Sequence, residues 1–150
     1  MKIELNRYFG NEKVTKSIMK VFMSNSTTPS LICEARETTF LNYSASFKGW
    51  MSYCLPEGNL CVRVRPTEIS PLTVALGTSS HQCKFLIAWH DRKESLPQRV
   101  LIGDADASIP EPNRKLTNQF SVFEHFTDLV RKNYLAGEGI EVVVKNGLNR

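Results

Sequence analysis

Apolar and polar residues alternate along the first third of the chain. The segment KIELNR (residues 2–7) places Ile3 and Leu5 between polar residues, and this period of two is typical of a half-buried strand. Residues 14–23 form a second, β-leaning run, and residues 30–36 form a third with an apolar face. A short polar turn separates these last two runs, so we predict that they pair as a β-hairpin.

Five shorter runs further along the chain also favour strands. In LCVRVR (residues 60–65) the valines alternate with Arg63 and Arg65, so both arginines lie on the same face. In KFLIAWH (residues 84–90) apolar residues fall on both faces, which is typical of a central strand. The other three runs are LTVAL (72–76), VLIG (100–103) and GIEVVVKN (139–146).

Residues 118–139 form the one segment with a clear helical pattern. Apolar residues recur every three or four positions, which predicts a helix with one face packed on the sheet. Asn118 or Ser121 is expected to cap its start, with Ser121 and Glu124 as a capping box, and Gly137 to end it. The residues of the predicted apolar stripe are Phe120, Val122, Phe123, Phe126, Leu129, Val130 and Tyr134.

Together these segments predict one domain of the α+β class over residues 1–150. We expect a β-rich fold, in which one amphipathic C-terminal helix packs on a twisted, partly closed and mostly antiparallel sheet. The composition fits this prediction, because 41% hydrophobic and 23% charged residues are ordinary for a globular protein. A chain of 150 residues is also long enough to bury a core.

Net charge and targeting signals say little about the partner and the cellular location of the protein. The formal net charge of +4 is spread along the chain without a block of like charges, so a nucleic-acid partner is not favoured. No apolar run approaches the ~20 residues of a membrane helix, and the first ten residues lack the apolar core of a signal peptide. We therefore expect no membrane partner and a cytosolic protein, unless a phage particle or a dedicated secretion machine carries it out.

Four cysteines are the first residues to consider for chemistry. None of them forms a C-x-x-C pair, and the histidines are scattered among them, so neither a structural zinc site nor a cofactor is expected. In a cytosolic protein they are best interpreted as reduced, mostly buried small hydrophobes. They are Cys33, Cys54, Cys61 and Cys83.

Residues 38–53 are less regular and rich in aromatic residues, among them Trp50 and Tyr53. A loop of this kind is either a lid that packs on the sheet or a surface for a partner. The simpler interpretation is a long loop that its own aromatic side chains anchor.

His90 is the sharpest catalytic candidate, because histidine titrates near neutral pH and suits general acid–base work. Its partner would have to be a nucleophile within hydrogen-bond reach. Cys83 lies at the far end of the same predicted strand, roughly 23 Å away at ~3.3 Å per residue. Cys54 or Cys61 could reach His90 only through the fold. A structural or surface histidine is therefore the favoured interpretation.

The order of the segments resembles that of a known group of domains. An ICEARE-like strand, a Pro-x-Gly turn before an alternating strand, a strand ending in histidine and a short apolar strand ending in glycine come first. A helix entered through L-x-N…F…F and a final β-branched strand follow. Over nearly the whole chain this order resembles a family of small uncharacterised domains from bacteria and phages, especially those of gut bacteria. That family in turn weakly resembles the L,D-transpeptidase catalytic domain.

The resemblance implies a changed active site. The family histidine matches His90, and the family's Gly-Cys pair falls on Gln98 and Arg99. The Gly-Asn that follows the family histidine is replaced by Asp91 and Arg92. An arginine cannot be the acyl-accepting nucleophile because its guanidinium stays protonated. No cysteine follows Cys83 in the chain, so a shifted alignment does not restore one.

The sequence thus favours a non-enzymatic protein-binding or structural module of a phage or mobile element, which binds another protein. One alternative is a cell-wall-active cysteine enzyme, with His90 as base and Cys54 or Cys61 as nucleophile. A second is a nucleic-acid binder that uses Arg63, Arg65, Arg92, Lys93 and Arg99. The residues expected to bind the partner are His90, Arg99, Arg65, Arg63, Trp50 and Tyr53.

Overall fold

The computed structural model describes residues 1–10, 14–38, 55–65, 73–77, 83–89, 99–105, 108–111 and 113–147. These ranges hold nine strands and one helix. The first four strands are β1 (Lys2–Gly10), β2 (Val14–Phe22), β3 (Leu31–Thr38) and β4 (Gly58–Arg65). They are followed by β5 (Thr73–Gly77), β6 (Cys83–Ala88), β7 (Arg99–Ala105), β8 (Leu116–Thr117), α1 (Gln119–Leu135) and β9 (Glu141–Asn146).

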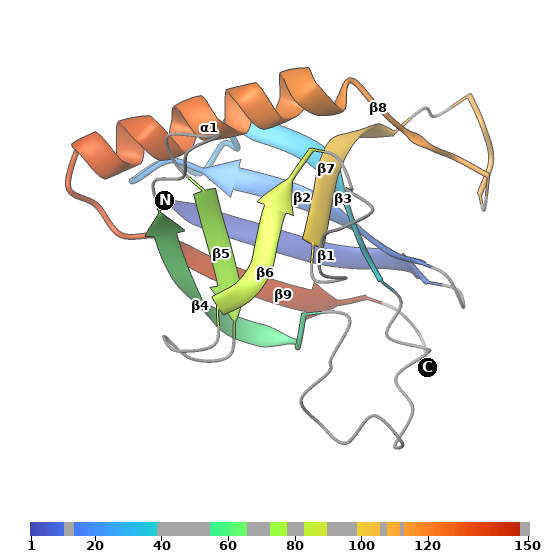
Figure 1. Ribbon diagram of the computed structural model, residues 1–150, viewed down its shortest axis with the longest axis horizontal. Coiled ribbons are helices and arrows are strands. Elements are labelled where there is room, and N and C mark those ends of the chain that lie inside the picture. Colours follow the sequence, from blue (N-terminus) through green and yellow to red (C-terminus); the bar gives the residue numbers. More distant parts are fainter. Residues whose placement is uncertain are drawn as a thin grey trace.

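The strands form a closed barrel, which goes further than the partly closed sheet that the sequence predicts (Figure 1). Their order is β3-β2-β1-β9-β4-β5-β6-β7, and pairing of β3 with β7 closes the ring of eight. The short strand β8 pairs with β7 outside this ring. Two neighbouring pairs are parallel, β1 with β9 and β6 with β7, and the other pairs are antiparallel.

Alternate residues of each strand fill the barrel interior, because successive side chains of a strand point to opposite faces. The expected strand over residues 2–7 is confirmed, with Ile3 and Leu5 fully buried. The expected hairpin is also confirmed, since β2 and β3 pair antiparallel. An eight-stranded barrel encloses a space that side chains can fill. The interior is apolar around residues such as Met19, Val74, Ile87, Ile102 and Val144.

The helix α1 runs along one rim of the barrel (Figure 1). Val122, Phe126 and Val130 pack into the core, as the predicted stripe requires. Phe120 and Tyr134 do not, because their side chains are 55% and 60% exposed, so the predicted stripe is too wide. Among the described residues, no helix is long and apolar enough to cross a membrane.

The start of α1 differs from the predicted capping box. Asn118 occupies the N-cap position with a φ of 49°, and its side chain makes no capping hydrogen bond. That side chain donates to Asp104 instead, at 3.2 Å. Ser121 therefore lies inside the helix and caps nothing. The predicted stop is confirmed, because Gly137 follows the helix with a φ of 73°, a left-handed conformation that glycine adopts readily.

Candidate functional site

The structure describes only part of the predicted binding site. Arg63 and Arg65 lie on β4, and Arg99 is the first residue of β7. His90, Trp50 and Tyr53 lie outside the described residues. The same holds for Cys54, Arg92 and Lys93 of the alternative sites.

Strand register places Arg63 and Arg99 in one row across four strands. Arg63 pairs with Ala75 on β5, Ala75 pairs with Leu86 on β6, and Leu86 pairs with Arg99 on β7. Three steps between neighbouring strands separate the two arginines, which is about 14 Å at ~4.8 Å per step. Arg63 is exposed, and Leu86 and Arg99 are half-buried. Ala75, between them, is 1% exposed.

Every charged residue at an outer position of β4 to β7 is basic. Outer positions are those that alternate with interior residues such as Phe85 and Ile87. The only acidic residue in these four strands, Asp104, shares the inner side with Ile102 at the rim. We call this surface the basic face, and the charged residues on it whose side chains the structure describes are Arg63 and Arg99.

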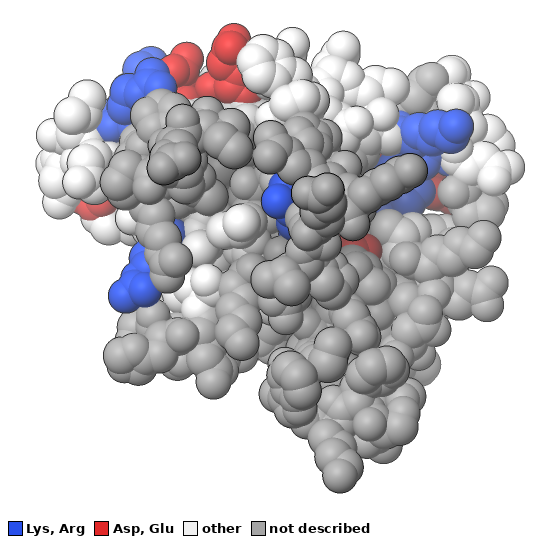
Figure 2. Space-filling model, viewed as in Figure 1, with Lys and Arg blue, Asp and Glu red and all other residues white. Residues whose placement is uncertain are grey.

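Figure 2 shows the molecule from the side on which β5 and β6 lie in front. Basic side chains are visible between the grey residues, and basic and acidic side chains lie next to each other along the upper edge, over α1.

The described cysteines do not form a thiol site. Cys33 lies inside the barrel, where burial, followed by the nearby charges of Asp104 and Glu34, raises the pKa of its thiol to about 12. Cys83 is buried, and its thiol donates to the backbone oxygen of Cys61 at 3.7 Å. Cys61 itself is exposed on β4. A thiol with a raised pKa is a poor nucleophile at neutral pH, because the thiolate is the reactive form.

An ion pair that the sequence pattern did not predict lies inside the barrel, between Arg7 of β1 and Glu37 of β3. The two side chains are 2% and 1% exposed, and Arg7 Nη2 lies 3.3 Å from both carboxylate oxygens of Glu37. The pair holds the backbone of Leu55, whose N–H donates to Glu37 at 2.6 Å and whose oxygen accepts from Arg7. A signal for it was present, because Arg7 continues the alternation that puts Ile3 and Leu5 in the core.

The electrostatics of this pair follow from its burial. Burial raises the pKa of the Glu37 carboxyl above its usual range, and the Arg7 charge and the Leu55 N–H offset only part of that effect. Ser17 of β2 is the residue that pairs with Arg7 of β1 in the strand register. The Ser17 hydroxyl and the Arg7 Nε are both buried without a hydrogen-bond partner among the described residues. The Arg7–Glu37 ion pair holds the backbone of Leu55, just before β4, so the pair has a structural explanation.

A second group of buried charges lies outside the barrel, where the chain after β7 packs on β2 and β3. Lys16 is 1% exposed and forms an ion pair with Glu111. Arg36 donates to Glu34 at 3.0 Å and to the backbone oxygen of Arg114 at 2.6 Å. These contacts fasten Glu111 and Arg114 to the barrel wall, so this cluster also has a structural explanation.

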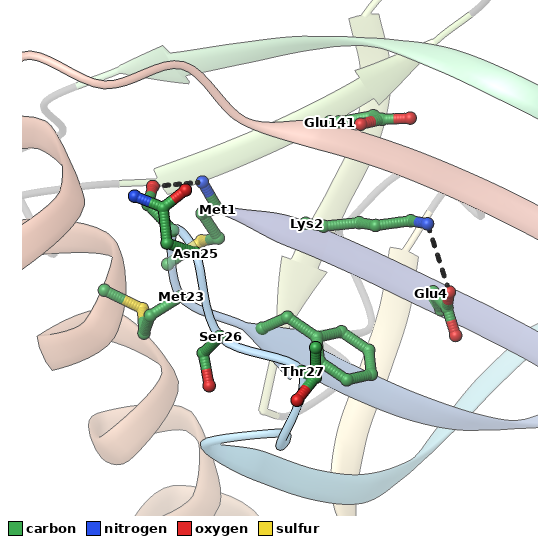
Figure 3. Close-up of a pocket in the computed structure, with 10 residues that line it drawn as sticks. Met1, Lys2, Glu4, Met23, Asn25, Ser26, Thr27 and Glu141 are labelled. Carbon is green, nitrogen blue, oxygen red and sulfur yellow. Dashed lines mark hydrogen bonds and ion pairs between the residues drawn. The ribbon is translucent and has the colours of Figure 1, made fainter.

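Figure 3 shows a surface pocket of about 430 Å³ between the β2–β3 turn and the beginnings of β1 and β9. Inside it Lys2 forms an ion pair with Glu4 at 3.3 Å, and Lys145 contacts Glu4 at 3.4 Å from outside the pocket. Because these charges compensate one another, the pocket favours neither anions nor cations. Its lining includes Lys2, Glu4, Met23, Asn25, Thr27 and Glu141.

Comparison with known proteins adds no assignment. A scan of protein-family models, a search of curated proteins and a search of solved structures each found no match to this chain. Among the described residues, no group of three or more histidine, cysteine, aspartate or glutamate side chains could hold a metal ion. Among the described features of the chain, the basic face has the clearest chemical preference.

Proposed function

We propose that this protein is a non-enzymatic binding module that engages an acidic surface of another protein through its basic face. The observation that carries the proposal is the single row in which Arg63 and Arg99 flank Ala75 and Leu86. Arginine suits this role because its planar guanidinium binds a carboxylate through two parallel hydrogen bonds. Leu86, which is half-buried, adds an apolar contact between the two charges.

Charge arrangement supports an anionic partner. The like charges of Arg63 and Arg99 repel one another, and no acidic residue at an outer position of these strands offsets them. A bound acidic surface removes this repulsion and steers the encounter by long-range attraction. Arg99 already interacts with a neighbour in the chain, but a guanidinium has five N–H donors and can serve a further acceptor.

The resemblance to phage- and bacteria-associated domains is part of the proposal. If that relation holds, Arg99 occupies the position of the nucleophilic cysteine of L,D-transpeptidase-like domains. A thiolate that would attack an acyl group is then replaced by a cation that binds a carboxylate. The protein would act as a module of a phage or mobile element, in the host cytoplasm or in the virion.

A cysteine enzyme has less support from the described residues. Its reaction needs a thiolate near a base, and the Cys33 thiol is buried with a pKa of about 12. Cys61 is exposed on β4, on the same outer face as Arg63.

Binding measurements with charge-reversed variants test the proposal. We expect a labelled polyglutamate peptide to bind at low salt, and Arg63→Glu and Arg99→Glu each to weaken binding at least about tenfold, or ~1.4 kcal/mol. Arg131→Glu is the matched control, because Arg131 is an exposed residue of α1, away from the basic face, and its side chain pairs with Asp128. It should leave binding nearly unchanged.

Two outcomes would contradict this proposal. The first is the absence of polyglutamate binding at low salt. The second is tighter binding of a single-stranded oligonucleotide of equal charge, with a steep salt dependence, which would favour the nucleic-acid alternative.

A further inference from the structure

The solvent-facing side of α1 carries a stripe of apolar and charged residues. Its members are exposed and recur every three or four positions, so at ~3.6 residues per turn they lie within an arc of about 80°. We call this set the outer stripe, and it consists of Phe120, Glu124, Asp128, Arg131 and Leu135. We infer that two copies of the chain associate through their outer stripes, with the two helices antiparallel. Dimer formation is independent of the proposed function.

Both ends of the outer stripe expose a large apolar side chain. Phe120 is 55% exposed and Leu135 is 77% exposed, and α1 forms the upper edge of the molecule in Figure 1. Burial of this apolar area against a partner is favourable. Phe120 is also held in place, because its ring meets that of Trp89 edge to face, with 5.2 Å between the ring centroids. Its docking therefore costs little conformational entropy.

The order of charges along α1 makes the outer stripe complementary to itself. Acidic residues come first and basic residues last, and Figure 2 shows side chains of both signs next to each other along this edge. If a two-fold axis passes between residues 127 and 128 of two antiparallel helices, Glu124 lies opposite Arg131 of the second copy. The same axis places Phe120 opposite Leu135 of the second copy. Two-fold symmetry repeats each of these contacts, as in most protein dimers.

Charge selects the antiparallel arrangement over the parallel one. In a parallel two-fold pair each residue lies beside its own copy, so Glu124 would face Glu124 and Arg131 would face Arg131, and like charges repel. In the antiparallel pair the two Asp128 carboxylates approach the axis, but each is already paired with Arg131 of its own chain at 2.9 Å. The guanidinium of Arg131 has enough donors for this carboxylate and for Glu124 of the second copy. The exposed Lys132 adds a further positive charge beside them.

The size of the contact sets the expected affinity. One pair of 17-residue helices buries less than the ~1,600 Å² of a standard stable interface. We therefore expect a dissociation constant in the micromolar range or weaker. Below that concentration the chain is monomeric, and there the Arg131 variants serve as controls for peptide binding and for stability.

Sedimentation velocity of the full-length protein tests for the dimer. Between about 1 µM and about 1 mM we expect the mean mass to rise from that of one chain toward that of two. Leu135→Ser should weaken association at least about threefold, because it removes apolar area from the contact. Far-ultraviolet circular dichroism and the melting temperature confirm that each variant is folded before it is compared.

Two charge-reversed variants test the antiparallel pairing. Glu124→Arg and Arg131→Glu should each weaken self-association at least about tenfold, because each places like charges opposite one another. An equal mixture of the two should associate at least as tightly as the natural chain, since the new cation of one then faces the new anion of the other. Glu141→Arg and Lys145→Glu make the same changes of net charge at exposed positions of β9. Alone and mixed, these controls should behave like the natural chain.

Three results would overturn the antiparallel dimer. The first is a mass of one chain over the whole concentration range. The second is a dimer that neither Glu124→Arg nor Arg131→Glu weakens, because another surface or a parallel pair would then hold the two copies together. The third is a mixture of these two variants that associates no better than each variant alone. Weakening by the single variants and recovery in their mixture, without either effect in the β9 controls, would support it.

Discussion

Arg7 and Glu37 form an ion pair inside the barrel, and together they hold both backbone polar groups of Leu55. This arrangement brings a segment between β3 and β4 into the barrel wall and buries the Leu55 side chain completely. Two buried charges are tolerated here because each is paired and also hydrogen-bonded to the backbone. Loss of either partner alone is therefore expected to destabilise this end of the barrel strongly.

Removal of one member of the pair tests that expectation. Arg7→Met leaves the buried Glu37 carboxylate without its cation, and such a change costs about 3–5 kcal/mol of unfolding free energy. Urea denaturation measures the loss. Arg131→Met is the control, because its exposed pair with Asp128 contributes less than about 1 kcal/mol. The double variant Arg7→Met/Glu37→Leu should recover part of the loss, and equal effects of Arg7→Met and the control would contradict the prediction.

The raised pKa of Glu37 predicts a pH dependence of stability. Because the folded pKa lies above the unfolded value of 4.5, the folded protein binds more protons between these two values. The contribution of Glu37 to stability is thus fully present below 4.5 and is lost as the pH rises through the folded pKa. The variant Glu37→Gln lacks this titration. Its free energy of unfolding should therefore increase relative to that of the natural chain as the pH rises.

Unfolding free energies of both proteins from about pH 4 to about pH 8 measure this difference. A difference that changes in the opposite direction would show that Arg7 and the Leu55 N–H outweigh burial. The pKa of Glu37 would then be lowered in the folded protein.

Gly103 of β7 is required because β8 and the start of α1 approach this position closely. A Cβ at this position would lie 2.8 Å from the backbone oxygen of Thr117 and 2.9 Å from Cγ of Gln119. Gly103→Ala should therefore destabilise the fold by about 1–3 kcal/mol, as overpacking does. Gly139→Ala is the matched control, because a Cβ there meets nothing within 4 Å. Thermal unfolding compares the two, and equal stability would place β8 and α1 farther from β7.

Much of the fold could be predicted from local patterns. The alternation in β1 and β3 identified Ile3, Leu5 and Cys33 as core residues because each strand has one buried face. Closure of the barrel could not be predicted in this way. It depends on pairs such as Ala35 with Ile102, which are far apart in sequence and leave no local signal.

The candidate site, too, could be predicted only where a local pattern was enough. The alternation of β4 placed Arg63 on an outer face, but its alignment with Arg99 needed the register of three strand pairs. Arg7 and Glu37 were missed because polar residues at core positions were not interpreted as partners of each other. The helix stripe was predicted too wide, since periodicity does not show how much of the apolar face a helix buries, and Phe120 and Tyr134 stay more than half exposed.

Thiol labelling distinguishes the binding module from a cysteine enzyme. Of the described cysteines, Cys61 should react fastest with iodoacetamide at neutral pH, because it is exposed. The pKa of about 12 leaves Cys33 with roughly 10³-fold less thiolate than a thiol at 9.0, so it should react only after unfolding. Peptide mass spectrometry after a short pulse measures each site.

His90→Ala distinguishes a binding module from a cysteine enzyme in which His90 activates a thiol. We expect it to leave the labelling rates unchanged. If it slowed the rapid labelling of one cysteine, His90 would act as a base toward that thiol, and the non-enzymatic proposal would be wrong.

The position of β9 has a consequence for how the chain folds during synthesis. Its residues lie between β1 and β4, so Val142 is bound to Ile3 on one side and to Leu60 on the other. The sheet of β1 to β3 and that of β4 to β7 are made first, and β1 and β4 remain open edges until residues 141–146 emerge from the ribosome. Open edges invite pairing with other chains. Slow, late closure and a need for protection of the nascent chain follow from this strand order.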